Sequence, residues 1–179
     1  MDLQPSEDIL IPRQDIQDKI TELAKQVAKE YHGKHLILLA VLNGSLFVAT
    51  DLMKALWQEG LTDVVFDTLA VSSYEHATEA VHEPRLTKDC KTDIAGRHVL
   101  LVEDIIDTGR TLVFVLDLLK KRQPATLKTL TLLSKPSRRE VTIEADYTGF
   151  VIDNVWVEGY GLDTDGMFRG SPDILKRVS

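Results

Sequence analysis

Residues 98–122 read HVLLVEDIIDTGRTLVFVLDLLKKR, and this stretch decides the fold. Its first six residues are apolar enough for a buried strand, and residues 111–122 predict a helix with basic residues in its last turn. A polar turn that contains Gly109 joins the two. A strand, a turn and a helix in this order are typical of one unit of a parallel sheet, because parallel strands need a crossover connection.

The same alternation continues on both sides of this stretch. Helices are predicted at 14–31, where apolar residues recur every three or four positions, and at 46–58. Strands are predicted at 36–42, 64–73 and 126–134, with short strand-like pieces at 150–152 and 155–157. The polar residues 74–97 predict a long loop with room for a short β-hairpin. We therefore expect an α/β fold, a mainly parallel twisted sheet flanked by helices.

Composition narrows the class of protein. The chain has 179 residues, enough for one compact domain, and a formal net charge of −7, which disfavours nonspecific nucleic-acid binding. Its longest apolar run, residues 36–42, is too short to cross a bilayer, and the acidic N-terminus does not look like a secretory signal. The single cysteine, Cys90, fits a reducing compartment. We expect a cytoplasmic protein that binds neither nucleic acid nor membranes.

The polar turn combines groups that suit opposite partners. The predicted helix begins at Thr111, and Thr108 and Gly109 lie just before it. Unpaired backbone amides at the start of a helix bind phosphate, and glycine lets the backbone approach it closely. Glu103 and Asp104, at the end of the apolar strand, can accept hydrogen bonds from vicinal sugar hydroxyls. The simpler alternative is a threonine cap with two solvated acids. One ligand, a sugar phosphate, would satisfy both halves of the stretch.

The other polar breaks also follow predicted strands. They are Asn43-Gly44-Ser45, Ser72-Ser73-Tyr74 and Lys135. Ligands of open parallel sheets bind at the carboxyl ends of the strands, so we expect these breaks and the turn to form one site.

VEDIIDTGRTL at 102–112 resembles the phosphoribosyl-diphosphate motif of the purine phosphoribosyltransferases, and most closely that of the bacterial-type hypoxanthine-guanine members. The similarity extends from about Ile9 to Asp173. It implies the type I phosphoribosyltransferase fold, as a single domain over 1–179 with a small hood from about 1–15 and 150–179. It also implies Mg²⁺ as cofactor and a reaction of phosphoribosyl diphosphate with hypoxanthine or guanine that gives IMP or GMP and pyrophosphate.

The resemblance also implies roles for residues of the motif. Asp107 would be the catalytic acid or base near N7 of the purine. Glu103 and Asp104 would contact the ribose hydroxyls and contribute to the metal site. The 5′-phosphate would be held by Thr108, Gly109, Arg110 and Thr111.

Two further segments match loops of the family. Leu42-Asn43-Gly44-Ser45 resembles the pyrophosphate loop, although many relatives have a lysine or arginine where Asn43 stands. Ser73-Tyr74 resembles the start of the flexible catalytic loop, but the residues that follow depart from the family pattern. Because Asn43 replaces that cation with an amide, pyrophosphate binding would depend more on metal and backbone here.

The remaining roles concern the base and the leaving group. Lys135 would donate to O6 of the purine, which suits hypoxanthine and guanine but not adenine. In VWVEGYGLD at 155–163, Trp156 would stack on the base and Val157 would offer backbone groups to its edge. Asp163 would hold Mg²⁺ through water, and Arg169 would reach the pyrophosphate.

Several alternatives stay open at this point. A regulatory RNA-binding protein could keep this fold to sense phosphoribosyl diphosphate, although the net charge of −7 disfavours that class. Within enzymes, the alternatives are xanthine- or adenine-preferring transferases. Relatives form dimers and tetramers, so a homodimer or a homotetramer is expected.

Overall fold

The structure is a computed structural model that describes residues 4–76 and 79–177, without the side chains of residues 73–83. Its main sheet has six strands in the order β4-β3-β2-β5-β6-β7. The bounds are β2 Leu36–Leu42, β3 Val64–His76, β4 Glu79–Lys88, β5 His98–Ile106, β6 Thr126–Ser134 and β7 Tyr147–Val151. All neighbours in this sheet pair in parallel except β4, which is antiparallel to β3. The predicted fold class is confirmed.

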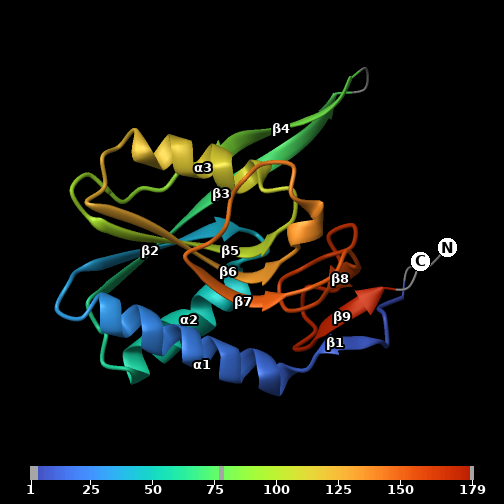
Figure 1. Cartoon of the computed structure of the whole chain (residues 1–179), viewed down its shortest axis with the longest axis horizontal. Coiled ribbons are helices and arrows are strands. Elements are labelled where there is room, and N and C mark those ends of the chain that lie inside the picture. The colour runs from blue at the N-terminus through green and yellow to red at the C-terminus, as the bar shows by residue number, and fades with distance from the viewer. Residues whose placement is uncertain (1–3, 77–78, 178–179) are drawn as a thin grey trace.

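Helices cover both faces of this sheet (Figure 1). α1 (Arg13–Glu30) and α2 (Leu46–Gln58) lie on one face, and α3 (Arg110–Lys120) lies on the other. Alternate residues of β2 therefore enter different clusters of buried side chains. Leu36, Leu38 and Ala40 pack with α1 and α2, and their neighbours along the strand pack with α3. Burial on both faces explains why β2 reads as an unbroken apolar run.

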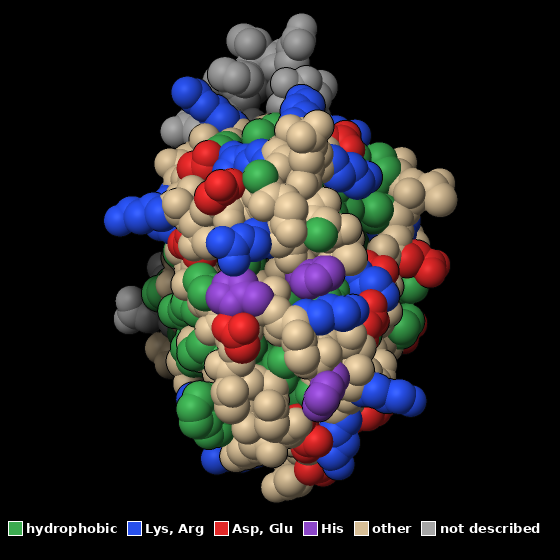
Figure 2. Space-filling view, turned by 90° about the vertical axis from the view of Figure 1, so that its left-hand side faces the viewer, with side chains coloured by type: hydrophobic (Ala, Val, Ile, Leu, Met, Phe, Trp, Pro, Cys, Tyr) green, Lys and Arg blue, Asp and Glu red, His purple; other side chains and the backbone are tan. Residues whose placement is uncertain are grey.

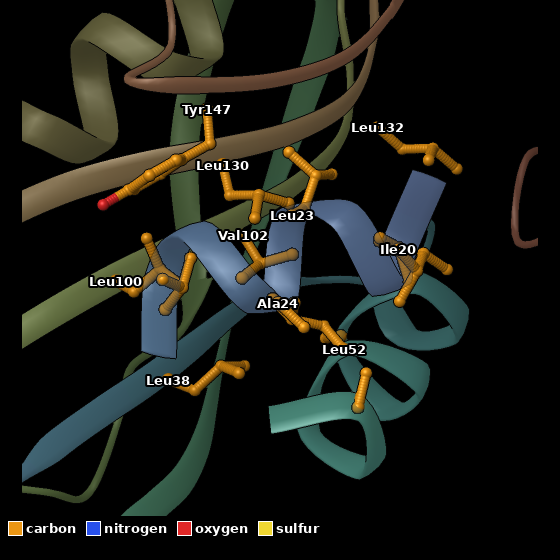
Figure 3. Close-up of a cluster of buried hydrophobic side chains, with 14 of the residues drawn as sticks. Ile20, Leu23, Ala24, Leu38, Leu52, Leu100, Val102, Leu130, Leu132 and Tyr147 are labelled. Atoms are coloured by element: carbon orange, nitrogen blue, oxygen red, sulfur yellow. The ribbon is translucent and has the colours of Figure 1, made fainter. Parts of the chain in front are cut away.

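The cluster under α1 and α2 joins side chains from distant parts of the chain (Figure 3). Ile20, Leu23 and Ala24 of α1 and Leu52 of α2 are at most 2% exposed. Figure 3 shows them facing strand side chains, namely Leu38, Leu100, Val102, Leu130 and Leu132. This contact fixes β2, β5 and β6 relative to one another, and so fixes the position of their carboxyl ends.

A second, smaller sheet joins the two ends of the chain. It has the order β1-β9-β8, all antiparallel, with bounds Ile9–Ile11, Ile174–Arg177 and Trp156–Glu158 (Figure 1). Asp173 accepts from the backbone N–H of Arg13 at 2.7 Å and from its guanidinium at 3.1 Å. β1 and β9 were not predicted, because strands of three or four residues carry too little periodicity to detect.

The segment 74–97 contains the β-hairpin that the prediction allowed for, but the hairpin is long, and the predicted loop is wrong over most of the segment. β3 continues to His76 and pairs with β4 in a long antiparallel hairpin, leaving only residues 89–97 as a connection. β4 is an edge strand, and such a strand tolerates Pro84 and a polar composition that hid it from the sequence pattern. β5 also runs three residues beyond the predicted strand, so Asp104 lies within it together with Glu103.

Surface features agree with the composition. Among the helices in the described part of the chain, none is both long and apolar enough to span a membrane. Figure 2 shows Lys and Arg interspersed with Asp and Glu on the face that it presents. Basic side chains do not form a continuous field there.

Candidate active site

A cavity of about 330 Å³ opens at the carboxyl ends of β2 and β5, beside Val71 of β3. Its lining comes from residues 41–44, 103–109 and 111–112, together with Val71, Asp163 and Arg169. Two separate polar breaks predicted from the sequence, the Asn43-Gly44 segment and the turn after β5, are thus brought together. Residues from the far C-terminal part of the chain close the cavity, which the strand pattern alone did not indicate.

Gly44 lies directly under the carboxylate of Asp104. A Cβ atom at position 44 would be 1.7 Å from Oδ2 of Asp104, so only glycine allows this approach. Gly161 also approaches Gly44 closely, since a Cβ atom at position 161 would lie 2.1 Å from the carbonyl oxygen of Gly44. The peptide bond between Leu42 and Asn43 is cis. The close approaches at Gly44 and Gly161 hold the backbone of the 42–44 segment against β5 and the C-terminal segment, at the edge of the cavity.

The two adjacent acids of β5 are in an environment that disfavours their charge. Glu103 is only 6% exposed, and burial, reinforced by the neighbouring Asp104, raises its pKa well above the usual value. Burial also raises the pKa of Asp104 to about 6, against the opposing hydrogen bond from the N–H of Ile105. The charge of Asp163 contributes to the same shift. Hydroxyl donors or a cation in the cavity would relieve this cost.

The turn after β5 presents the start of α3 to the cavity. Gly109 is the residue before the helix and has φ of +86°, and a Cβ there would lie 2.5 Å from Ile143. Gly109 has no side chain that could cap the helix, and the N–H of Arg110 makes only a long bond of 3.4 Å to Oγ1 of Thr108, so the first backbone amides are available to bind an anion. Thr108 and Thr111 line the cavity beside these amides. Arg110 does not, because its guanidinium pairs with Glu140 at 2.6 Å.

Asp107 lies in a cluster of basic side chains. Its carboxylate is 3.1 Å from Nε of Arg138 and 3.5 Å from Nζ of Lys135. Lys135 is only 5% exposed, so it is not the ordinary surface lysine that most isolated lysines are. The pairing of Asp107 with Lys135 agrees with the predicted adjacency of the two strand ends, whereas Arg138 was not predicted.

Arg139 is a second residue that the sequence analysis missed. Its guanidinium donates to the carbonyl oxygens of Ile106 and Asp107 on the turn, to that of Lys135 at 3.2 Å, and to Oγ of Ser134 at 2.8 Å. It thereby ties the end of β5 to the end of β6. The only signal in the sequence was two consecutive arginines soon after a strand that ends at the site.

The C-terminal segment contributes unequally to the cavity. Arg169 donates to Asp163 at 2.6 Å and to the carbonyl oxygen of Gly161 at 2.5 Å, and both Arg169 and Asp163 line the cavity. Lys135, Trp156 and Val157 lie outside its lining. Val157 is buried in β8, whereas Trp156 is 58% exposed.

Comparison with known proteins agrees with this geometry. The family described as the phosphoribosyl transferase domain matches residues 8–165. A hypoxanthine-guanine phosphoribosyltransferase of Streptococcus pneumoniae is 45% identical over 88% of this chain and 87% of its own length. A crystal structure of a hypoxanthine-guanine phosphoribosyltransferase from Bacillus anthracis superposes with a TM-score of 0.89 at 38% identity, covering 97% of this chain and 100% of that chain.

The chain belongs to the hypoxanthine-guanine phosphoribosyltransferase family. The resemblance inferred from VEDIIDTGRTL is therefore confirmed, as is the type I phosphoribosyltransferase fold. The bifunctional protein TilS/HprT of Listeria innocua is also 42% identical over 93% of this chain, which spans 25% of that relative. The roles that the resemblance implies for single residues remain predictions.

The family is expected to use Mg²⁺, and the acids of this chain fit that ion in part. Within residues 4–76 and 79–177, no group of three or more His, Cys, Asp or Glu side chains converges to hold a metal by itself. Asp104 and Asp163 nevertheless line one cavity, with Glu103 beside them. Mg²⁺ is commonly held by one or two carboxylates together with water and substrate phosphates. The site thus suits Mg²⁺ that arrives with a phosphorylated substrate.

Two of the predicted loop residues cannot be placed in the family site. The backbone of Ser73 and Tyr74 belongs to β3, but their side chains lie outside the described residues. Asn43 does line the cavity. Its role in binding pyrophosphate stays a prediction.

Proposed function

We propose that this chain is a purine-salvage hypoxanthine-guanine phosphoribosyltransferase. It transfers the 5-phosphoribosyl group of phosphoribosyl diphosphate to N9 of a 6-oxopurine and releases pyrophosphate. The observation that carries the proposal is a single cavity that contains both Glu103 and Asp104 and the start of α3. A ribose 5-phosphate offers hydroxyls to the acids and a phosphate to the amides, so it satisfies both groups at once.

The reaction depends mainly on positioning. Glu103 and Asp104 hold the ribose hydroxyls, and the turn at 108–111 holds the 5′-phosphate. C1′ is thereby fixed relative to the incoming purine, and fixed geometry of this kind supplies much of the rate enhancement in two-substrate reactions. Positive charge that develops on the ribose ring is stabilised by the same carboxylates.

Asp107 and Lys135 read one edge of the purine. In guanine, O6 and N7 are neighbouring acceptors on that edge, and hypoxanthine shares its 6-oxo group. Lys135 donates to O6, and Asp107 exchanges the purine proton at N7. The 3.5 Å between Nζ of Lys135 and Oδ2 of Asp107 supports this pairing, because the two side chains can meet neighbouring atoms of one ring. Adenine has an amino group in place of O6, so it offers Lys135 no acceptor.

The leaving group is held by Arg169 and by the backbone of the 42–44 segment. Arg169 is at present paired with Asp163, so pyrophosphate competes with that carboxylate for the guanidinium. When bound by Asp163, Glu103 and Asp104, Mg²⁺ supplies charge neutralisation of the departing pyrophosphate. Asn43 brings an amide in place of a cation, which increases the share of binding left to backbone amides and metal.

The whole chain acts as one domain, with the small β1-β9-β8 sheet as the hood that carries Trp156 and Val157 to the purine. The exposed ring of Trp156 and the contacts between the chain ends support this assignment. The protein works in the cytoplasm as a homodimer or homotetramer. Light scattering coupled to size-exclusion chromatography distinguishes the two assemblies.

A pyrophosphate-release assay tests the proposed function. Purified protein is incubated with phosphoribosyl diphosphate and, in turn, hypoxanthine, guanine, xanthine and adenine, with and without Mg²⁺. We expect Mg²⁺-dependent release with hypoxanthine or guanine and almost none with adenine. Activity that favours adenine would contradict the role of Lys135, whereas activity that favours xanthine, itself a 6-oxopurine, would change only the preferred base. No release with any base, combined with retention of RNA in a filter-binding assay, would favour the regulatory alternative.

A further inference from the structure

Trp156 is connected to a buried carboxylate through one hydroxyl group. Its indole Nε1 donates to Oγ1 of Thr164 at 2.8 Å, and Oγ1 of Thr164 donates to Oε2 of Glu158 at 2.7 Å. Trp156 itself is 58% exposed, whereas Glu158 is fully buried. Two hydrogen bonds thus link an exposed aromatic side chain to a buried carboxylate.

The direction of each hydrogen bond in this chain is fixed by chemistry. An indole N–H can only donate, and an ionised carboxylate can only accept. Burial opposes the charge of Glu158, but bonds from the N–H of Ser6, from Thr164 and from Arg177 together hold its pKa below the usual range. The Thr164 hydroxyl must therefore accept from Trp156 and donate to Glu158. Only a hydroxyl side chain can do both at this length.

Glu158 is itself a rigid anchor. It accepts from the backbone N–H of Ser6 at 2.7 Å and from Nε of Arg177 at 3.1 Å. Ser6 lies near the start of the chain and Arg177 near its end, so the carboxylate is fixed by both terminal segments of the small sheet. Thr164 is fixed as well, because its backbone exchanges two hydrogen bonds with Met167, at 3.2 and 3.0 Å.

We propose that Thr164 and Glu158 are positioning residues that set the plane of the Trp156 indole for stacking on the purine. The inference rests on the proposed function, in which Trp156 meets the base. An exposed ring with free χ angles would lose rotational freedom when a ligand binds, and fixing it beforehand removes part of that cost. Thr164 also follows Asp163, which lines the cavity, so the purine platform is tied to the site that holds the other substrate.

Thr164→Val is the principal test, because it keeps the branched shape and removes only the hydroxyl. We expect the KM for hypoxanthine or guanine to rise roughly three- to tenfold, as for the loss of one ordinary hydrogen bond, with the KM for phosphoribosyl diphosphate unchanged. Thr164→Ser keeps the hydroxyl and should restore the wild-type value. An unchanged purine KM in Thr164→Val, or an equal rise of both KM values, would overturn the positioning role.

A direct readout of the ring needs no turnover. The chain has two tryptophans, so Trp57→Phe, near the end of helix α2, leaves Trp156 as the only one. In this background, time-resolved fluorescence anisotropy should show faster local motion of Trp156 in Thr164→Val and in Thr164→Ala than in the parent. Equal motion in all three proteins would overturn the inference. The proposed function fails separately, if the wild-type protein forms no nucleotide from any purine.

Discussion

Gly44→Ala should damage the site with little change in side-chain chemistry. The new Cβ would lie 1.7 Å from Oδ2 and 2.6 Å from Cγ of Asp104. The carboxylate would have to retreat by about 1.3 Å to reach even the 3.0 Å of a very tight contact. It cannot rotate freely, because Oδ1 accepts from the N–H of Ile105 at 2.9 Å. The substitution therefore moves a substrate-binding carboxylate or displaces the 42–44 segment.

The magnitude follows from these contacts. Overpacking a tightly packed position costs roughly 1–3 kcal/mol, and the melting temperature of a protein of this size falls by about 2–4 °C for each kcal/mol. A displacement near 1 Å in a positioned group can reduce the rate by about 10²-fold. We expect kcat/KM for phosphoribosyl diphosphate to fall by about two orders of magnitude and the melting temperature to fall by several degrees.

Steady-state nucleotide formation and thermal unfolding measure both effects. Gly170→Ala is the matched control, because no atom lies within 4 Å of a Cβ at that position and its φ is not positive. It should behave as wild type in both assays. A Gly44→Ala protein with wild-type kcat/KM would show that the close approach of Asp104 has no part in substrate binding, and the reasoning would be wrong.

Three further changes test other parts of the site. Asp107→Asn removes the proposed acid or base and should lower turnover by about 10²–10⁴-fold with little change in phosphoribosyl-diphosphate binding; equal turnover would exclude the role. Arg139→Lys cannot reach all five acceptors, the fifth being the carbonyl oxygen of Ile143 at 3.2 Å, and each buried acceptor left unpaired costs roughly 1–3 kcal/mol, so calorimetry should show a lower melting temperature. The pKa of Asp104, about 6, lies above the ordinary 3.8, so its ionisation costs folding free energy that grows as pH rises between these values. At pH 8, Asp104→Asn should therefore melt roughly 4–10 °C above ligand-free wild type, whereas at pH 4 the two proteins should melt at the same temperature. The activity of the variant should fall. A difference in melting temperature of the same size at both pH values would contradict this explanation.

The main sheet was accessible from sequence because its signals are local. β2 is buried on both faces, and α1 has apolar residues at helical spacing. The secondary structure of each can therefore be recognised from its own residues. Prediction failed where partners decide the structure. The polar edge strand β4 is a strand because β3 offers it a free edge, and β1 and β9 are strands because each pairs with the other.

The candidate site shows the same division. Residues 103–111 contain an anion-binding turn and the adjacent acids Glu103 and Asp104 in one continuous stretch. The resemblance to the family rested on these residues. The sequence could not show that Gly44 supports Asp104, that Arg139 ties β5 to β6, or that Thr164 links Trp156 to Glu158.

From the sequence alone followed the type of every long element except β4, the family, and the chemistry of the turn after β5, because these depend on residues next to one another. Tertiary structure alone decided the raised pKa values of Glu103 and Asp104, the closure of the cavity by Asp163 and Arg169, and the anchoring of the exposed indole. Each of these depends on burial and on distances between groups far apart in the chain. Such distances are set only when α1, α2 and α3 pack on the sheet and bring the strand ends together.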